Sequence, residues 1–325
     1  MEHKLVCLGE ILMDFLPLPT EGEVAGFTLH PGGGPFNVAV GLARLGQPTA
    51  FVGKIGTDYF GRRLRRTVRA EGIDDRWLLD VAAPSTLAFV TVEAGEPDFA
   101  FYGEGAADSR LTRDELPAEL FAQATMLHFG GISLLRGTTP DTALAAAERL
   151  QGRALIACTP NIRPQLVRDG HAYTAILSRA VATCDLLTLS SADVAWLAPR
   201  VDPLEFAVGQ LEVGPILVIL TKGADGVTSF RRRRGAIERL DMPAFPVTVA
   251  DTVGAGDAFS AGLLAALASD AVVSRAALEA LPAEQLRAAL RQGVATAALA
   301  CTRPGADPPR STELAAFLAA NSQTK

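Results

Sequence analysis

Asp251-Thr-Val-Gly-Ala-Gly-Asp-Ala-Phe259 is the stretch on which the interpretation of this 325-residue chain depends most. A β-type run, Phe245–Val249, leads into its glycine-containing turn, and the turn opens a long helix that we expect to begin near Gly256. The first turn of a helix presents unpaired N–H groups and the positive end of the helix dipole. The stretch therefore predicts a site for a phosphate or a developing anion.

Asp257 belongs to the start of this predicted helix. A carboxylate there is placed to accept a proton from a substrate hydroxyl beside the anion site. Phosphoryl transfer needs such a base to orient the nucleophile, together with fixed N–H dipoles that take up charge. The alternative is that Asp257 only caps the helix and the glycines only turn the chain, because Asp is a preferred N-cap residue.

A second glycine cluster, Pro31-Gly-Gly-Gly-Pro-Phe-Asn37, precedes another predicted helix. Asn37 lies in the first turn of that helix, where its amide can reach a polar ligand. Flexible turns use glycine runs constantly, so the cluster alone is weak evidence. The phrase Val52-Gly-Lys-Ile-Gly-Thr-Asp58 follows, and it reads as a strand running into a turn and a helix.

Short apolar runs alternate with helical stretches along most of the chain. The apolar runs predict buried strands at Lys4–Gly9, Thr49–Lys54, Thr125–Phe129, Ala154–Cys158, Asp185–Leu189 and Ile216–Leu220. The stretches between them predict helices at Asn37–Leu45, Asp58–Glu71, Pro140–Leu150, Ala172–Cys184 and Leu204–Leu211. Further helices are predicted at Asp257–Ala268, Pro282–Cys301 and Thr312–Ala320. This order is typical of a mostly parallel sheet with helices on both faces.

Two regions, about residues 12–31 and 85–103, break the alternation. The second reads as two strands, Thr86–Glu93 and Phe99–Tyr102, joined by a hairpin-like turn over residues 94–98. We expect these pieces to form a small, mostly antiparallel sheet that acts as a lid on the main domain. No linker-like segment or change of composition separates a second domain.

The composition excludes several classes of function. Hydrophobic residues make up 49% and charged residues 20%, which is a globular mixture, and the net charge of -6 argues against general binding of nucleic acid. The apolar runs are shorter than the roughly 20 residues of a membrane span, and the N-terminus does not resemble a signal peptide. The cysteines show no metal-ligand spacing and are expected to be buried thiols of a cytoplasmic protein; they are Cys7, Cys158, Cys184 and Cys301.

A run of four arginines, Arg231–Arg234, lies between two probable strands, Val227–Phe230 and Ile237–Leu240. Like charges must stay in water, so we expect a solvated hairpin tip. A contact with nucleotide phosphate is the less favoured alternative.

The two glycine clusters in this order resemble the two signatures of the ribokinase-like (phosphofructokinase-B) family of carbohydrate kinases. The matching segments are GGGPFNVAVGLARLG…FVGKIGTD and DTVGAGDAFSAG, and the resemblance is collinear over essentially all of residues 1–325. It implies a single three-layer α/β/α domain with a mostly parallel central sheet and a small β-sheet lid. Within the family the chain looks most similar to bacterial fructokinases, through Gly9–Pro17, Ser85–Ala94, Phe99–Asp108, Pro160–Pro164 and Cys301–Pro309.

The resemblance implies a role for each matching residue. Asp257 becomes the general base, and the N–H groups of Gly254, Ala255 and Gly256 form the anion hole. The positions that hold sugar hydroxyls in the family fall on Asp14, Gly33 and Asn37. A carboxylate and an amide suit several hydroxyl bonds at once, although Asp14 could also be an ordinary exposed acid at a strand end.

The resemblance also implies a nucleotide segment and metal ions. Thr221-Lys-Gly-Ala-Asp-Gly226 resembles the TxGxxG nucleotide segment of the family, which assigns ATP to Thr221, Gly223 and Gly226. The reaction implies Mg²⁺, and the acidic motif associated with it falls on Asp193, with Ser190 in place of the commonest Asn. Asp251, with carbonyls near Val253 and in the Ala300–Gly305 loop, resembles a site for K⁺.

Two positions depart from the family pattern and bear on the sugar. Fructokinases and 2-keto-3-deoxygluconate kinases commonly carry Arg where this chain has Gly103, and the loss of that cation argues against an acidic substrate. Thr159 replaces the usual Asp, while Asn161 and Arg163 are retained. Arg163 either supplies a cation near the substrate or forms an ion pair that holds a loop.

The sequence therefore predicts a cytoplasmic ATP-dependent sugar kinase, first of all a fructokinase that makes D-fructose 6-phosphate. Other sugar kinases, 2-keto-3-deoxygluconate kinase and nucleoside kinase remain alternatives. A different alternative is a sugar- or nucleotide-binding regulatory protein on the same fold, since fold does not prove activity. We expect ATP and a small sugar as partners, no nucleic acid, no membrane, and a homodimer formed through the lid.

Overall fold

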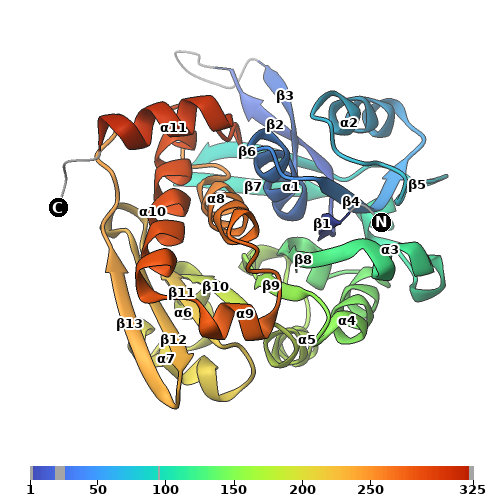
Figure 1. Cartoon of the computed structure of the whole chain (residues 1–325). Coiled ribbons are helices and arrows are strands. Elements are labelled where there is room, and N and C mark those ends of the chain that lie inside the picture. The colour runs from blue at the N-terminus through green and yellow to red at the C-terminus, as the bar shows by residue number, and fades with distance from the viewer. Residues whose placement is uncertain (1–2, 19–25, 94–95, 322–325) are drawn as a thin grey trace.

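The computed structural model describes residues 3–18, 26–93 and 96–321 of the chain. These residues form a sheet of nine strands and a smaller sheet of four, with helices around the larger one (Figure 1). Two of the predicted lid segments, residues 19–25 and the turn residues Ala94 and Gly95, lie outside the described residues.

The larger sheet is mostly parallel, as predicted. Its strands are β1 (Lys4–Leu8), β4 (Thr49–Gly56), β5 (Leu78–Val81), β8 (Ala124–Gly130), β9 (Leu155–Thr159), β10 (Leu186–Ser190), β11 (Leu217–Thr221), β12 (Val227–Arg233) and β13 (Ala236–Met242). They lie in the order β13-β12-β11-β10-β9-β8-β1-β4-β5. From β11 to β5 the neighbours are parallel, and β12 and β13 add an antiparallel edge. The carboxyl ends of the parallel strands therefore meet along one edge.

Helices cover both faces of this sheet, because successive side chains of a buried strand point to opposite faces. Cys7 of β1 belongs to one apolar cluster and its neighbour Leu8 to the other. The first face carries α1 (Gly34–Arg44), α2 (Tyr59–Ala70), α8 (Ala255–Ser269), α9 (Arg275–Ala280) and α10 (Ala283–Ala300), and α11 (Ser311–Ala320) packs on α10. The second face carries α3 (Ala118–Gln123), α4 (Thr139–Leu150), α5 (Gly170–Thr183), α6 (Ser191–Leu197) and α7 (Pro203–Gly209). The predicted three-layer arrangement is confirmed.

The smaller sheet is mostly antiparallel and lies beside α1 and α2 in Figure 1. Its strands are β2 (Leu12–Pro17), β3 (Phe27–Gly32), β6 (Leu87–Glu93) and β7 (Glu96–Tyr102), in the order β3-β2-β6-β7. Aromatic rings hold one of its faces: Phe15 stacks on Phe89 at 4.3 Å between ring centroids, and Phe60 of α2 packs edge-on against Phe15 at 5.7 Å. These contacts connect the smaller sheet to the main domain.

The predicted strand Phe245–Val249 is wrong. The chain leaves β13 at Met242, and residues 243–249 have no regular structure. Pro243 and Pro246 explain the difference, because proline has no N–H group to donate to a sheet ladder. The turn before α8 is therefore reached from an irregular segment. Sequence reasoning also missed the short helix α9.

The arginine run is only partly a solvated tip. Arg231 lies inside β12 and is 0% exposed. Its guanidinium donates to the carbonyl oxygen of Leu281 at 2.7 Å and to the Glu238 carboxylate at 2.5 Å. Buried partners therefore replace water for the first arginine of the run, and the exposed turn begins only at Arg234, which has φ 50°.

Candidate active site

Asp257 and Asn37 meet where two helices begin. Asp257 lies in the first turn of α8 and Asn37 in the first turn of α1. The Asn37 amide donates to Asp257 Oδ2 at 2.9 Å. The helices approach closely because a Cβ atom at Gly41 of α1 would lie 2.5 Å from the Cβ atom of Ala261 in α8. The predicted base and the predicted sugar-binding residue Asn37 are thus in direct contact.

The start of α8 has the form expected of an anion site. Gly254 is the N-cap residue, has φ 73°, and supplies no capping side chain to the first N–H groups of the helix. A Cβ atom here would lie 2.6 Å from the Cβ atom of Ala306. Gly256 follows at an exposed position, and the Ala255 N–H donates to the Thr252 carbonyl at 3.2 Å within the turn. Among the described residues no capping side chain therefore covers this turn against an approaching phosphate, and the Ala255 N–H is already bonded within the turn.

Burial sets the protonation of Asp257. The residue is 7% exposed, and this burial raises the pKa of its carboxyl group to about 6, against the lowering effects of the Asn37 hydrogen bond and the Arg163 charge. A carboxyl group with that pKa is ionised near neutral pH and binds a proton readily. It therefore has the properties of a general base.

Asp14 belongs to the same charged cluster. Burial raises its pKa to about 7, repulsion by Asp257 and Glu10 adds to the increase, and Arg163 opposes it. Its position inside β2 requires a glycine beside it, because a Cβ atom at Gly32 would lie 1.9 Å from Asp14 Oδ2. The alternative that Asp14 is an ordinary exposed acid at a strand end does not describe this environment, and its role in sugar binding stays a prediction.

Gly33 and Arg163 bring two further loops to the site. Gly33 is the N-cap residue of α1 with φ 111°, and a Cβ atom there would lie 2.6 Å from the Glu10 carbonyl oxygen. Arg163 follows β9 and donates to Asn161 Oδ1 at 2.5 Å. Asn161 itself has φ 45°, a left-handed conformation uncommon outside glycine. Arg163 thus fixes the loop and also places a positive charge near both carboxylates.

Glu10 is a site residue that sequence reasoning missed. It is 2% exposed and joins α1 to the segment after β8: Oε1 accepts from the Gly34 N–H at 3.0 Å and Oε2 from the Ser133 N–H at 3.0 Å. Burial raises its pKa to about 7, with the Ser133 hydroxyl opposing the shift. No local pattern marks Glu10, since its partners lie far along the chain.

The predicted nucleotide residues lie at the same edge of the main sheet. Thr221 ends β11, and its hydroxyl donates to the Leu189 carbonyl of β10 at 3.3 Å. Gly223 and Gly226 have φ 58° and 78°, and the Gly226 carbonyl accepts from the Lys222 N–H at 2.8 Å. Gly223 of this turn is exposed and Gly226 is buried.

The two predicted metal residues differ in their surroundings. Asp193 is 3% exposed; Oδ2 accepts from the Ser190 N–H and hydroxyl at 2.8 and 2.7 Å, and Oδ1 from the Ile162 N–H at 2.7 Å. Asp251 joins two loops, because its carboxylate accepts from the Val253 N–H at 3.0 Å and the Gly305 N–H at 2.7 Å. Among the described residues no group of three or more His, Cys, Asp or Glu side chains is arranged to hold a metal ion.

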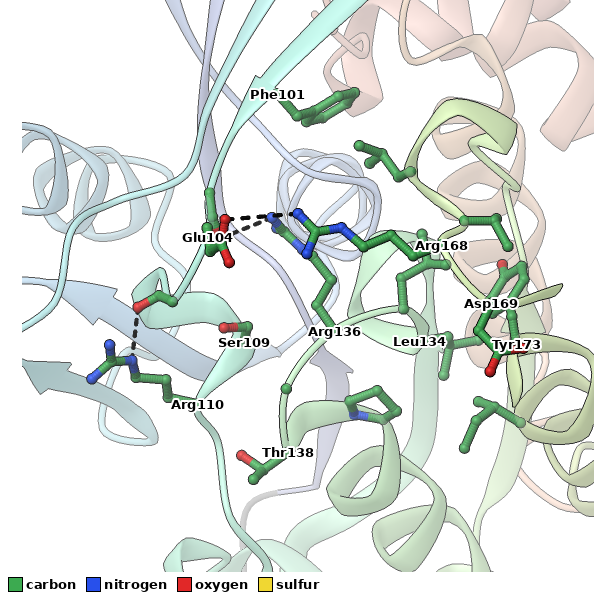
Figure 2. Close-up of a pocket in the computed structure, with 18 of the residues that line it drawn as sticks. Phe101, Glu104, Ser109, Arg110, Leu134, Arg136, Thr138, Arg168, Asp169 and Tyr173 are labelled. Carbon is green, nitrogen blue, oxygen red and sulfur yellow. Dashed lines mark hydrogen bonds and ion pairs between the residues drawn. The ribbon is translucent and has the colours of Figure 1, made fainter. Parts of the chain in front are cut away.

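A cleft of about 1210 Å³ lies between the smaller sheet and the second face of the main domain (Figure 2). Phe101, Tyr102 and Gly103 line it from the sheet side, and Arg136 and Tyr173 from the main domain. Phe101 is paired with Ala88, which in turn is paired with Asp14, so the cleft begins beside the Asp14 side of the site.

In the described part of the chain no helix is long and apolar enough to cross a membrane.

Known proteins are similar to this chain in both sequence and fold. The model of the pfkB family of carbohydrate kinases matches residues 2–313. A fructokinase of Rhizobium leguminosarum bv. trifolii is 37% identical over 87% of this chain and 85% of its own. The crystal structure of a fructokinase from Xylella fastidiosa with bound ATP has a TM-score of 0.90 at 29% identity and covers 99% of this chain and 100% of that one.

A second solved structure is informative about ligands of that protein. It is a double mutant of the Vibrio cholerae O395 fructokinase in a form with fructose, ADP and potassium ion bound, with a TM-score of 0.84 at 27% identity. The superposition covers 97% of this chain and 98% of that one. With a family match over nearly the whole length and a relative above one-third identity, this chain belongs to the pfkB family of carbohydrate kinases.

Proposed function

We propose that this protein is an ATP-dependent fructokinase that converts ATP and D-fructose to ADP and D-fructose 6-phosphate. The observation that carries the proposal is the buried Asp257 carboxylate at the glycine-rich start of α8, held by Asn37 at 2.9 Å. The fructokinases of Rhizobium leguminosarum and Xylella fastidiosa, similar over most of the chain, support the choice of substrate.

Asp257 acts as the general base. Its carboxylate accepts the proton of the sugar hydroxyl while that oxygen bonds to the γ-phosphorus and the bond from the γ-phosphorus to the ADP oxygen breaks. The N–H groups of Gly254, Ala255 and Gly256 supply the fixed dipoles that take up charge on the transferring group. Asn37 keeps the carboxylate oriented toward the acceptor.

Asp14, Gly33, Asn37 and Arg163 bind the sugar. Asp14 and Asn37 accept and donate hydrogen bonds to hydroxyl groups, and the bare backbone at Gly33 allows the sugar to approach α1 closely. Arg163 lowers the pKa of both Asp14 and Asp257, which favours their ionised forms when the substrate binds. Strand β2, the start of α1 and the loop after β9 thus contribute to one site for a small polar ligand.

ATP binds along the same edge, with its nucleoside end near Thr221, Gly223 and Gly226. The turn with positive φ at Gly223 and Gly226 leaves the backbone of Gly223 exposed beside the ends of β10 and β11, while Gly226 is buried. The Xylella fastidiosa protein, whose structure has bound ATP, shares this fold over its full length. The phosphates would then extend from this turn toward the start of α8.

Two ions fit the residues present. Asp251 joins the loop at Val253 to the loop at Gly305, and main-chain carbonyls of Val253 and residues 300–305 would hold K⁺, which the Vibrio cholerae protein binds. Both oxygens of Asp193 already accept protein hydrogen bonds, so Asp193 would meet Mg²⁺ only through water. Mg²⁺ bound to the ATP phosphates would neutralise their charge.

The whole chain works as one domain with a movable lid. The smaller sheet, formed from about residues 12–31 and 85–103, closes over the sugar and excludes water, so that the sugar hydroxyl is phosphorylated. Its open edges and the exposed ring of Tyr102, 65% exposed, offer a surface for a second copy, and we propose a homodimer. Cysteines without disulfides, three of them buried, suit a cytoplasmic protein.

The proposal is tested by measuring ADP release with a panel of acceptors: D-fructose, D-glucose, 2-keto-3-deoxygluconate and adenosine, each with ATP and Mg²⁺. We expect the highest kcat/KM with fructose and a lower rate when Na⁺ replaces K⁺. A preference for 2-keto-3-deoxygluconate or adenosine would replace the proposed substrate. Binding of ligands in a thermal-shift assay without ADP release would favour a regulatory protein.

A further inference from the structure

The cleft beneath the smaller sheet contains an arginine that the reaction described above does not use. Arg136 lies in the segment between β8 and α4, and its side chain is 22% exposed. In Figure 2 it extends toward the turn after β7 that contains Glu104, and Arg168 reaches the same turn from the other side of the cleft. Its neighbours decide what it can bind.

The register of the smaller sheet places Arg136 next to the sugar site. Asp14, Ala88 and Phe101 are paired across three strands and therefore share one face. Thr86, just before β6, and Gly103, just after β7, are two residues from Ala88 and Phe101 and continue this face about 7 Å away. A monosaccharide that contacts Asp14 and Phe101 would also reach Thr86, Gly103 and the adjacent Arg136.

Arg136 fills the space that a side chain at position 103 would occupy. A Cβ atom on Gly103 would lie 2.5 Å from Arg136 Nη1 and 2.7 Å from Thr86 Oγ1. Arg136 Nη1 donates to the Gly103 carbonyl oxygen at 3.0 Å. The guanidinium therefore depends on the absence of a side chain at 103, and it places a cation where that side chain would project.

The charge of Arg136 is already offset inside the protein. Its Nη2 lies 3.3 Å from Oδ2 of Asp108, which is 3% exposed and also accepts from the Thr86 hydroxyl at 2.5 Å. Within the described residues Arg136 Nε is buried without a hydrogen-bond partner. An arginine with a compensating carboxylate retains N–H donors for hydroxyl groups but carries little net charge for a carboxylate of the substrate.

We propose that Arg136 is the specificity-determining residue at the Gly103 end of the sugar site, and that its pairing with Asp108 selects a neutral ketohexose over a sugar acid. This inference rests on the proposed function, since it requires a sugar beside Asp14. Arg136 donates hydrogen bonds to sugar hydroxyls, and Asp108 positions the guanidinium and cancels its charge.

The test compares Arg136→Met with Arg110→Met. Arg110 lines the same cleft but is exposed, and among the described residues it donates to the Gly105 carbonyl at 2.7 Å, so it controls for a general loss of charge. We expect Arg136→Met to raise the KM for fructose about tenfold, the effect of losing one or two hydrogen bonds, with the KM for ATP unchanged. Arg110→Met should behave as the wild type.

A second variant tests the charge. Asp108→Asn leaves Arg136 with an uncompensated charge, so the ratio of kcat/KM for 2-keto-3-deoxygluconate to that for fructose should rise about tenfold. If Arg136→Met unfolds, Arg136→Lys replaces it in the test, because lysine keeps a positive charge. The KM for fructose should rise by the same factor, because one ammonium group cannot replace the several N–H donors of a guanidinium. Unchanged constants in folded variants would overturn the inference, whereas a wild type inactive with every sugar would overturn the proposed function instead.

Discussion

Two buried carboxylates, Asp257 and Asp14, determine how the proposed chemistry depends on pH. Burial raises the pKa of Asp257 to about 6 and that of Asp14 to about 7, and repulsion by Asp257 contributes to the second value. Their titrations are therefore coupled, and a pH profile reports the pair. The base must be ionised to accept a proton, so activity rises with pH through this range.

The first prediction concerns the partner of that base. The wild-type kcat/KM should show an acidic limb between about pH 6 and 7, and Asn37→Ala should move this limb to higher pH, because its hydrogen bond lowers the pKa of Asp257. Gln47→Ala, which removes an exposed amide bonded to Ser269 just beyond the other end of α1, should leave the limb in place. An acidic limb that stays at the same pH in Asn37→Ala would contradict the assignment of Asp257 as the titrating base.

The second prediction uses the arginine run. Arg231→Met removes a buried guanidinium and leaves the Leu281 carbonyl and Glu238 without their donor, so the free energy of unfolding should fall by about 3 kcal/mol. Arg234→Met alters the exposed turn of the same run and should change it by less than about 0.5 kcal/mol. Urea unfolding of both variants measures the two changes. Equal losses in the free energy of unfolding would show that Arg231 contributes no more to stability than Arg234.

Among the elements, the start of α8 is the one whose backbone shape matters most. Gly254→Ala puts a Cβ atom at φ 73° and 2.6 Å from the Cβ atom of Ala306. Gly46→Ala has a similar φ of 83°, but nothing lies within 4 Å of its added Cβ atom. Both variants carry the left-handed strain of about 1–2 kcal/mol, and only the first must move the loop that faces the anion site.

The third prediction follows from that comparison. Gly254→Ala should lower kcat at least about tenfold and unfold at a lower urea concentration than Gly46→Ala, which should keep normal kcat. Steady-state kinetics and urea unfolding of the two variants separate two effects: the backbone strain that both share, and the clash with Ala306 that only Gly254→Ala has. Equal kcat values for both would mean that the shape of this turn is not needed for phosphoryl transfer.

The elements also show which features of a sequence can be predicted and which cannot. The strand–helix order follows from local periodicity, turn residues and two motifs, and the structure confirms it. The apolar character of Phe245–Val249 predicts a strand, yet Pro243 before this run and Pro246 within it prevent the ladder. The structure places Asp257 with Asn37, whereas the roles of the site residues stay predictions.

Partners distant along the chain explain the misses. Glu10 contacts Gly34 and Ser133, and Arg136 contacts Gly103, so neither residue has a local signature. Arg231 is buried because α9 and its following turn supply carbonyl acceptors, among them Leu281, that the sequence around the run does not show. Such residues are determined by tertiary contacts rather than by pattern.

In the whole molecule, the parallel sheet and the smaller sheet place the reacting groups on opposite sides of one site. Loops at the carboxyl ends of β1, β8 and β9 carry Glu10, Ser133 and Arg163, while the smaller sheet carries Asp14. The aromatic contacts Phe15–Phe60 and Phe15–Phe89 couple the smaller sheet to α2, so closing the lid must move or compress this cluster. Bound sugar should therefore slow hydrogen exchange in β2 and β6 relative to β12 and β13.

The central claim is that Asp257 is the base of a sugar kinase, and Asp257→Asn tests it most directly. Asparagine keeps an oxygen for the Asn37 amide but cannot take the proton, so fructose affinity measured by calorimetry should stay within about threefold while single-turnover ADP release slows by about 10²–10⁴-fold. Asp270→Asn, at the exposed far end of α8, should match the wild type in both measurements. ADP release by Asp257→Asn at the wild-type rate would contradict the account.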